Sequence, residues 1–241
     1  LFEELDYCPT PIGAVSLRRR RDLKLDVDVF EIRLGDESLM TSLFTASEIA
    51  LARLGLAALD DPVTPDIVVG GLGLGYTAHA VLECAAGASL IVVEALAPVI
   101  EWHETGLLPL GAALAKDPRC HLVQGDFFAK AASQEGFDPD APGRLFDGIL
   151  VDIDHSPDAL LDDRNGSFYQ LDGLRRLTRH LRPGGVFGLW SDASPDEAFV
   201  ARLSRVFTDV RAEPVTFHNP LQDRPFTQTV YLAKVQRGAT S

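Results

Sequence analysis

The side chains best suited to chemistry lie in one short segment, Asp152 to His155, which follows an apolar run ending at Val151. A carboxylate there can orient an attacking group and take its proton, and an imidazole titrates near neutral pH. Asp152, Asp154 and His155 are therefore the candidate catalytic residues. The alternative is structural, with one acid capping the next loop and the other exposed. Because no further cluster of ligands accompanies these residues, we expect no metal site.

A glycine-rich loop at 70–75, Gly-Gly-Leu-Gly-Leu-Gly, follows a short apolar run and is the candidate cofactor site. Glycine permits positive φ and lets a ligand approach the backbone, and the next helix offers unpaired N–H groups to a polar ligand. We expect Gly71, Gly73 and Gly75 to contact a nucleoside. The dinucleotide pattern GxGxxG would need its third glycine at Tyr76, so an NAD site is disfavoured.

Three further candidates lie at or just after the ends of the next two apolar runs. Glu94 ends the run that begins at Leu90, and an acid at that position can accept hydrogen bonds from ribose hydroxyls. Asp126 follows the run His121–Val123 and can cap a helix, accept from an adenine amino group, or do both. Phe127 can stack on the base or belong to the core. We include Glu94, Asp126 and Phe127 in the predicted cofactor site.

A scaffold must bring these loops together, and the chain from Thr45 onwards predicts one. Short runs rich in Val, Ile and Leu alternate with helical stretches, as in parallel strands covered on both faces. The expected strands are Ile67–Val69, Leu90–Val93, His121–Val123, Phe146–Val151 and Val186–Trp190, closed by a hairpin of 210–217 and 227–235. The expected helices include Tyr76–Ala85, Pro98–Gly106, Phe127–Ala132, Phe168–Leu181 and about 195–207.

These elements predict an α/β, Rossmann-like fold with a mostly parallel seven-stranded sheet and a closing antiparallel hairpin. The spacing Gly71-x-Gly73-x-Gly75 resembles the first motif of class I methyltransferases, which implies a class I methyltransferase fold. A different pattern precedes it. Apolar and polar residues alternate from Leu23 to Val29, the signature of a half-buried strand, and four arginines occupy 18–21. We therefore assign residues 1–44 to a small N-terminal β-sheet region and 45–241 to the catalytic domain.

The order of these motifs resembles the spermidine synthase family, the polyamine aminopropyltransferases, within the superfamily of class I methyltransferases that use S-adenosylmethionine. The resemblance covers about residues 10–235. It implies that Glu94 holds the ribose, that Asp126 holds the adenine amino group, and that Asp152 helps to remove a proton from an attacking amine. It rests on Gly70–Gly75, Val93-Glu94, Gly125-Asp126, Phe146-Asp147 through Asp152, Phe168-Tyr169 and Leu181-Arg182-Pro183-Gly184-Gly185.

The chain departs from that family where the donor's amine would be held. The family's glycine loop carries an acid that grips the aminopropyl amine, but here the matching residue is Leu74, or Gly73 if the frame shifts by one. A buried ammonium without a partner is costly. The family's second acid is also displaced, with His155 in its place, and the segment Met40–Phe44 lacks the family's glutamine.

Three hypotheses for the function follow. The first is methyl transfer from S-adenosylmethionine to a small acceptor, which the missing acid favours. The second is aminopropyl transfer from decarboxylated S-adenosylmethionine to an amine, which Asp152 and Asp154 favour. The third is a non-catalytic regulatory protein that keeps the nucleoside pocket.

Charge and composition narrow the partners. The net charge is −13, from 35 acidic and 22 basic residues, so a cationic small molecule is an easier partner than nucleic acid. No apolar run has the roughly 20 residues that span a bilayer, and the first residues lack the pattern of a signal peptide. Three widely spaced cysteines suit a reducing compartment, so we expect a cytoplasmic protein. Open edges of the N-terminal sheet leave room for a homodimer.

Overall fold

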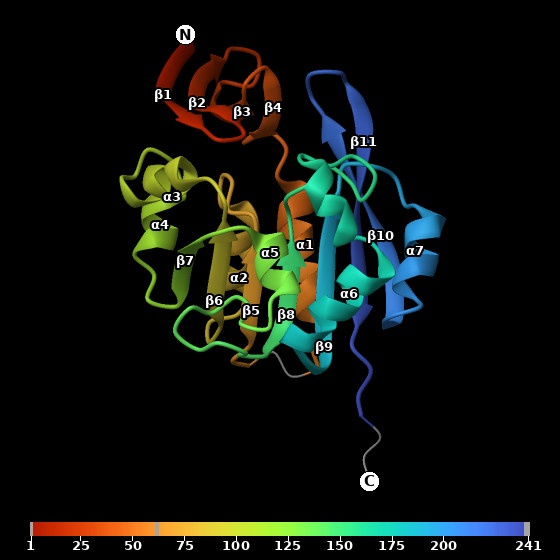
Figure 1. Cartoon of the computed structure of the whole chain (residues 1–241). Coiled ribbons are helices and arrows are strands. Elements are labelled where there is room, and N and C mark those ends of the chain that lie inside the picture. Colours follow the sequence, from red (N-terminus) through yellow and green to blue (C-terminus); the bar gives the residue numbers. More distant parts are fainter. Residues whose placement is uncertain (1, 61–62, 239–241) are drawn as a thin grey trace.

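Two separate sheets organise the chain. The computed structural model describes residues 2–60 and 63–238. A four-stranded antiparallel sheet is followed by a seven-stranded mixed sheet, which confirms the predicted α/β architecture. In Figure 1 the four-stranded sheet lies above the seven-stranded sheet, on the side of the carboxyl ends of the parallel strands. None of the described helices is both long and apolar enough to cross a membrane.

The N-terminal sheet is a simple meander. Its strands are β1 (Phe2–Thr10), β2 (Gly13–Asp22), β3 (Val27–Leu34) and β4 (Glu37–Thr41), paired in that order. The strand predicted from Leu23 to Val29 is wrong in its first half, because residues 23–26 form the β2–β3 turn and Leu23 is 86% exposed. The four arginines lie on β2, where each forms an ion pair with an acid of the same sheet, such as Arg19 with Glu3.

The larger sheet has the strand order β10-β11-β9-β8-β5-β6-β7. Only β11 runs antiparallel to its neighbours, because it returns between β9 and β10 as the second arm of the closing hairpin. The strands are β5 (Asp66–Gly70), β6 (Ser89–Glu94), β7 (Cys120–Gln124), β8 (Phe146–Val151), β9 (Leu181–Ser191), β10 (Thr208–Asn219) and β11 (Arg224–Lys234). The order reverses between β5 and β8, so the ligand crevice is expected where these two strands end.

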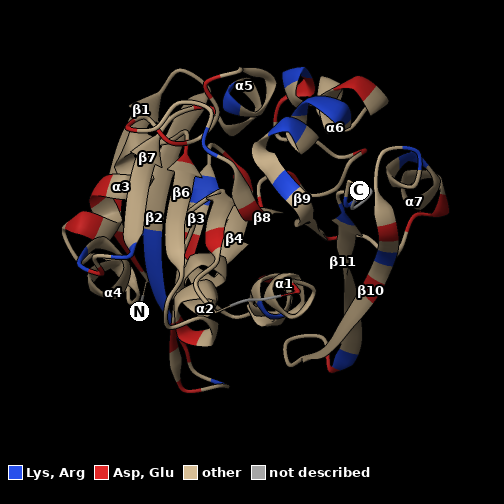
Figure 2. Cartoon of the chain, turned by 90° about the horizontal axis from the view of Figure 1, so that it is seen from below, with Lys and Arg blue, Asp and Glu red and all other residues tan. Residues whose placement is uncertain are grey.

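Helices cover both faces of this sheet, as the view from below shows in Figure 2. One apolar core joins α1 to α4 to the sheet, and a second, rich in aromatic rings, joins α5 to α7 to the opposite face. The helices are α1 (Ala46–Ala57), α2 (Tyr76–Cys84), α3 (Ala97–Glu104), α4 (Gly111–Ala115), α5 (Phe127–Ala132), α6 (Leu171–Leu177) and α7 (Glu197–Leu203), with single 3₁₀ turns at Asp163–Ser167 and Thr178–His180.

One predicted helix is much shorter than expected. The sequence predicts a helix from Phe168 to Leu181, but α6 covers only Leu171–Leu177. Phe168 and Tyr169 precede the helix and are buried in the aromatic core. The Arg-Pro-Gly-Gly segment that follows belongs to β9, where Gly184 has a φ of +82° and the pairing with β8 shifts register.

Candidate functional site

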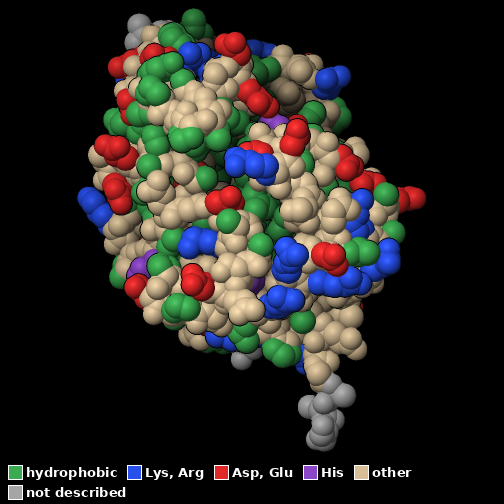
Figure 3. Space-filling model, viewed as in Figure 1, with side chains coloured by type: hydrophobic (Ala, Val, Ile, Leu, Met, Phe, Trp, Pro, Cys, Tyr) green, Lys and Arg blue, Asp and Glu red, His purple; other side chains and the backbone are tan. Residues whose placement is uncertain are grey.

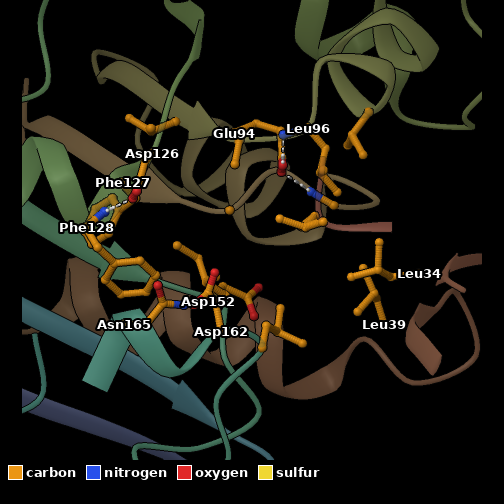
Figure 4. A pocket seen from close by; sticks show the side chains of 18 of the residues that line it. Leu34, Leu39, Glu94, Leu96, Asp126, Phe127, Phe128, Asp152, Asp162 and Asn165 are labelled. Atoms are coloured by element: carbon orange, nitrogen blue, oxygen red, sulfur yellow. Dashed lines mark hydrogen bonds between the residues drawn. The ribbon is translucent and has the colours of Figure 1, made fainter. Parts of the chain in front are cut away.

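A pocket of about 560 Å³ opens where β5, β6, β7 and β8 end. Figure 3 shows the surface hollowed between the N-terminal sheet and the larger domain, with apolar side chains at its edge. Figure 4 shows Glu94 and Asp126 on one wall, Asp152 and Asn165 opposite, and Leu34 of the N-terminal sheet at one end. The pocket therefore lies between the two sheets, at the predicted crevice.

The glycine loop forms the floor of this pocket, and its backbone requires glycine. Gly71, Gly73 and Gly75 have φ values of +93°, +47° and +92°. A side chain at Gly71 would place its Cβ 2.1 Å from the backbone oxygen of Asp152, so the loop and the end of β8 approach each other closely. Gly71 and Gly73 line the pocket, whereas Gly75 packs against the ring of His103 from α3.

His103 is a support of the loop that the sequence did not suggest. Its side chain is fully buried, and Nε2 lies 2.8 Å from the Gly73 carbonyl oxygen. Burial lowers the pKa of His103, so the ring is neutral and Nε2–H donates to that carbonyl. Within the described part of the chain, Nδ1 has no hydrogen-bond partner. An interior histidine distant in sequence gives no local signal of this contact.

Glu94 ends β6 and holds the glycine loop from the side. Its carboxylate accepts from the backbone N–H groups of Leu72 and Leu96 at 3.0 and 2.8 Å, and from Gly73 at 3.5 Å. Burial raises the pKa of Glu94. A carboxylate has about four acceptor positions, so three backbone donors leave room for one hydroxyl donor from a ligand. Glu94 also lines the pocket.

Asp126 and the aromatic residues after it form the other end of the same wall. Asp126 caps α5 by accepting from Phe128 N and Ala129 N at 2.8 and 3.1 Å. Phe127 lines the pocket but is only 2% exposed, because its ring stacks on Phe137 in the core. Phe128 is more accessible and also lines the pocket, so it offers more surface to a planar base than Phe127 does.

Asp152 lies at the end of β8, beside the glycine loop. Its Oδ2 accepts from the hydroxyl of Thr77 on α2 at 2.8 Å. Burial raises the pKa of Asp152, and the hydrogen bond from Thr77 opposes this shift. A carboxylate with a raised pKa in a pocket is suited to proton transfer near neutral pH.

Asp154 and His155 face away from the pocket. Asp154 is 1% exposed, and its oxygens accept from Tyr169 Oη, Leu161 N and Asn165 Nδ2 at 2.8, 2.8 and 3.1 Å. It therefore anchors the loop that follows β8. His155 Nε2 lies 3.1 Å from Glu37 Oε1 on β4, so it joins this loop to the N-terminal sheet. Neither residue lines the pocket.

Glu48, on the first turn of α1, is a second residue that the sequence analysis missed. It lines a second, water-sized cavity of about 10 Å³ together with Asp152, Tyr76 and Met40. Burial and the adjacent Asp152 carboxylate raise the pKa of Glu48. An acidic residue in the first turn of a helix is common because its charge interacts favourably with the helix dipole. The sequence therefore gave no reason to single out Glu48.

Met40 lies against Gly73, one of the two positions at which the resemblance implies an amine-gripping acid. A Cβ added to Gly73 would lie 2.2 Å from Met40 Cε and 2.4 Å from its sulfur. The Leu74 N–H points to the same sulfur at 3.0 Å. Leu74 itself is 3% exposed and packs in the core. Gly73 is therefore the position that faces the pocket, and a thioether fills the space beside it.

The described residues contain no group of three or more metal-ligating side chains close enough to hold an ion. The charged side chains that line the pocket are mainly acidic: Glu94, Asp126, Asp152 and Asp162 face one described cation, Arg164. Arg164 is 82% exposed and pairs with Asp162 at 2.5 Å. The lining residues are Ile12, Ile32, Leu34, Leu39, Met40, Gly71, Gly73, Val93, Glu94, Ala95, Leu96, Val99, Asp126, Phe127, Phe128, Ala129, Ala132, Asp152, Ile153, Leu161, Asp162, Arg164, Asn165 and Ser167.

No protein-family model matches the chain. Among solved structures, spermidine synthase from Thermotoga maritima matches 96% of this chain and 72% of its own, at 16% identity and a TM-score of 0.70. A spermidine synthase in complex with the transition-state analogue AdoDATO matches 96% of this chain and 73% of its own, at 17% identity and a TM-score of 0.72. Human methyltransferase-like protein 13 in complex with SAH matches 81% of this chain and 85% of its own, at 18% identity and a TM-score of 0.59. The chain therefore has a spermidine-synthase-like form of the class I methyltransferase fold.

Proposed function

We propose that this chain binds S-adenosylmethionine, or its decarboxylated form, and transfers a group from the donor to a small acceptor. One observation carries the proposal: Glu94, Asp126 and Asp152, at the carboxyl ends of β6, β7 and β8, line one pocket around the glycine loop that follows β5. The excess of acidic side chains in that pocket suits a cationic sulfonium compound. Two proteins of the same fold were solved with AdoDATO and with SAH, which supports a donor of this class.

In this proposal each residue has a separate task. Glu94 accepts from the ribose, and Asp126 accepts from the adenine amino group with the oxygen that capping leaves free, while Phe128 covers the base. The donor supplies an electrophilic carbon next to its sulfonium, so the protein mainly has to position the acceptor and take its proton. Asp152 is the residue for that task, since it borders both the glycine loop and the pocket.

Methyl transfer is the form of the reaction that we favour. The thioether of Met40 fills the space beside Gly73, so that space holds no acid for the amine of decarboxylated S-adenosylmethionine. Aminopropyl transfer remains the second candidate, and one observation favours it: Glu48 lies beside Asp152 and provides a carboxyl group near the loop from another element.

The test is calorimetric titration with S-adenosylhomocysteine and with methylthioadenosine, followed by product assays with each donor and putrescine. We expect S-adenosylhomocysteine to bind and Asp152→Asn to abolish turnover while its Kd changes by less than about threefold. If neither nucleoside binds at millimolar concentration, the proposal is wrong. Binding without turnover for any acceptor tested would support the non-catalytic alternative.

A further inference from the structure

The small cavity beside the glycine loop joins two carboxyl groups from elements far apart in the sequence. Glu48 comes from α1 and Asp152 from the end of β8, and both line a space of about 10 Å³, enough for one water molecule or one similarly small group. Two adjacent carboxylates in a partly buried site repel each other, so such a pair tends to hold one proton between them. The hydrogen bonds around Ser47 indicate where that proton lies.

Ser47 is fully buried and has three close polar neighbours. Its Oγ lies 2.8 Å from Glu48 Oε2, 2.5 Å from Gln228 Oε1 and 2.8 Å from Trp190 Nε1. The indole N–H can only donate, so Ser47 accepts from Trp190. The single Ser47 proton is then shared between two oxygens, Glu48 Oε2 and Gln228 Oε1, and can satisfy only one of them.

The orientation of Gln228 decides between them. Its amide nitrogen donates to Asp192 Oδ1 at 2.7 Å, so its oxygen must face Ser47 and accept the Ser47 proton. The contact between Ser47 Oγ and Glu48 Oε2 is then a hydrogen bond only if Glu48 is the donor. When Glu48 is a neutral carboxylic acid, each of these four contacts is a hydrogen bond with one donor and one acceptor.

The charges around Glu48 agree with this count. The titratable groups that face it are Asp152 from β8, Asp192 from the loop after β9, and the phenol of Tyr76 on α2. All three are acids, and together with burial Asp152 and Asp192 raise the pKa of Glu48. A cation bound in the main pocket beside Asp152 would oppose this effect, because a nearby positive charge favours the ionised form of a carboxyl group.

We propose that Glu48 is a second functional carboxyl group of this site, which holds a proton in the ligand-free protein and releases it to solvent when a cationic group binds beside Asp152. The release, but not the proton on Glu48, rests on the proposed function. The cation is either the sulfonium of the donor or an ammonium group of the acceptor. Asp152 stays ionised in both states, so the proton lost from Glu48 adds one negative charge that balances the positive charge of the ligand.

Infrared spectroscopy of the ligand-free protein tests whether Glu48 holds a proton. At neutral pH we expect a carbonyl stretch from a protonated carboxylic acid that is lost in Glu48→Gln and kept in Glu83→Gln. Glu83 is a matched control because it is a glutamate on α2 with a side chain 64% exposed. If Glu48→Gln leaves the carboxylic acid bands unchanged, the proposal is overturned.

A second variant keeps this test decisive if Glu48→Gln does not fold. Gln228→Met removes the oxygen that takes the Ser47 proton, so Ser47 can donate to Glu48 and favour its carboxylate. The Glu48 band should then disappear at a lower pH than in the wild type. A titration of the band that is unchanged in Gln228→Met would refute the hydrogen-bond assignment.

Calorimetry in buffers of different ionisation enthalpy tests whether Glu48 releases its proton when a cation binds. S-adenosylmethionine carries the sulfonium charge and S-adenosylhomocysteine does not, so the difference in protons released isolates the effect of the cation. We expect an excess of up to about one proton per site for the charged donor, and none in Glu48→Gln. Putrescine added to the S-adenosylhomocysteine complex forms the ammonium arm. Release in neither arm, or release that survives in Glu48→Gln, overturns the proposal, whereas failure of S-adenosylhomocysteine to bind overturns the proposed function instead.

Discussion

Replacing Asp154 with Ala should destabilise the protein strongly, although Asp154 resembles a catalytic acid in the sequence. Its carboxylate is 1% exposed and accepts from Tyr169 Oη, Leu161 N and Asn165 Nδ2. Burial and Asp154 keep the pKa of Tyr169 well above its usual value, so the phenol remains a donor. Each donor left unsatisfied costs about 1–3 kcal/mol, and partial hydration of the three donors limits their sum to roughly 3–5 kcal/mol.

Urea unfolding measures this effect directly. The midpoint should fall for Asp154→Ala with little change in the slope of free energy against denaturant. Asp158→Ala is the matched control, because Asp158 lies in the same loop but is exposed, so its stability should change by less than about 0.5 kcal/mol. Donor binding should also weaken in Asp154→Ala, since the anchored loop contributes Leu161 and Asn165 to the pocket. A variant with wild-type stability would refute the structural role and return Asp154 to the list of catalytic candidates.

The remaining predictions concern binding, specificity and pH. Glu94→Gln should weaken S-adenosylhomocysteine binding by about 1–3 kcal/mol, roughly 5- to 150-fold in Kd by calorimetry, because it removes charged hydrogen bonds; an unchanged Kd would place the ribose elsewhere. The double variant Met40→Ala, Gly73→Asp should shift preference towards decarboxylated S-adenosylmethionine in competition binding, since aspartate tolerates the φ of +47° and the alanine makes room; Gly73→Asp alone should bind neither donor well. His155→Ala should cost less than about 1 kcal/mol in unfolding free energy and leave donor binding unchanged, because its contact with Glu37 is partly exposed. Glu48→Gln should become more stable relative to the wild type as pH rises above the ordinary glutamate pKa of 4.5. Because the pKa of Glu48 is raised in the folded state, the wild type loses stability with pH once Glu48 ionises in the unfolded chain but not in the folded one. A stability difference that is constant with pH would contradict a raised pKa of Glu48.

The fold could be predicted in most of its parts because its signals are local. Each parallel strand is a short apolar run, and the glycine loop follows the first of them, so the order of elements was readable. Errors arose where local signals misled. Alternation from Leu23 predicted a strand across what is the β2–β3 turn, and the helical pattern from Phe168 extended over rings that tertiary packing draws into the core.

The residues of the candidate site also differ in how far the sequence could predict their positions. Side chains at strand ends, such as Glu94, Asp126 and Asp152, could be predicted to meet because parallel strands end at one edge of the sheet. Side chains one or two residues further on could not be placed, because a loop has no fixed period. Asp154 turns inward to anchor its loop and His155 turns to the N-terminal sheet, although both are near neighbours of Asp152 in the sequence.

The sequence alone therefore determined the βα order, the glycine loop and the acids that end the strands, since each depends on neighbours along the chain. Only the tertiary structure decided which other elements reach that loop. Met40 arrives from β4 to fill the space beside Gly73, and Glu48 arrives from α1 to share a cavity with Asp152. The physical reason is that steric exclusion and the pKa of a carboxyl group depend on distances across space, which residues remote in sequence set only when the chain is folded.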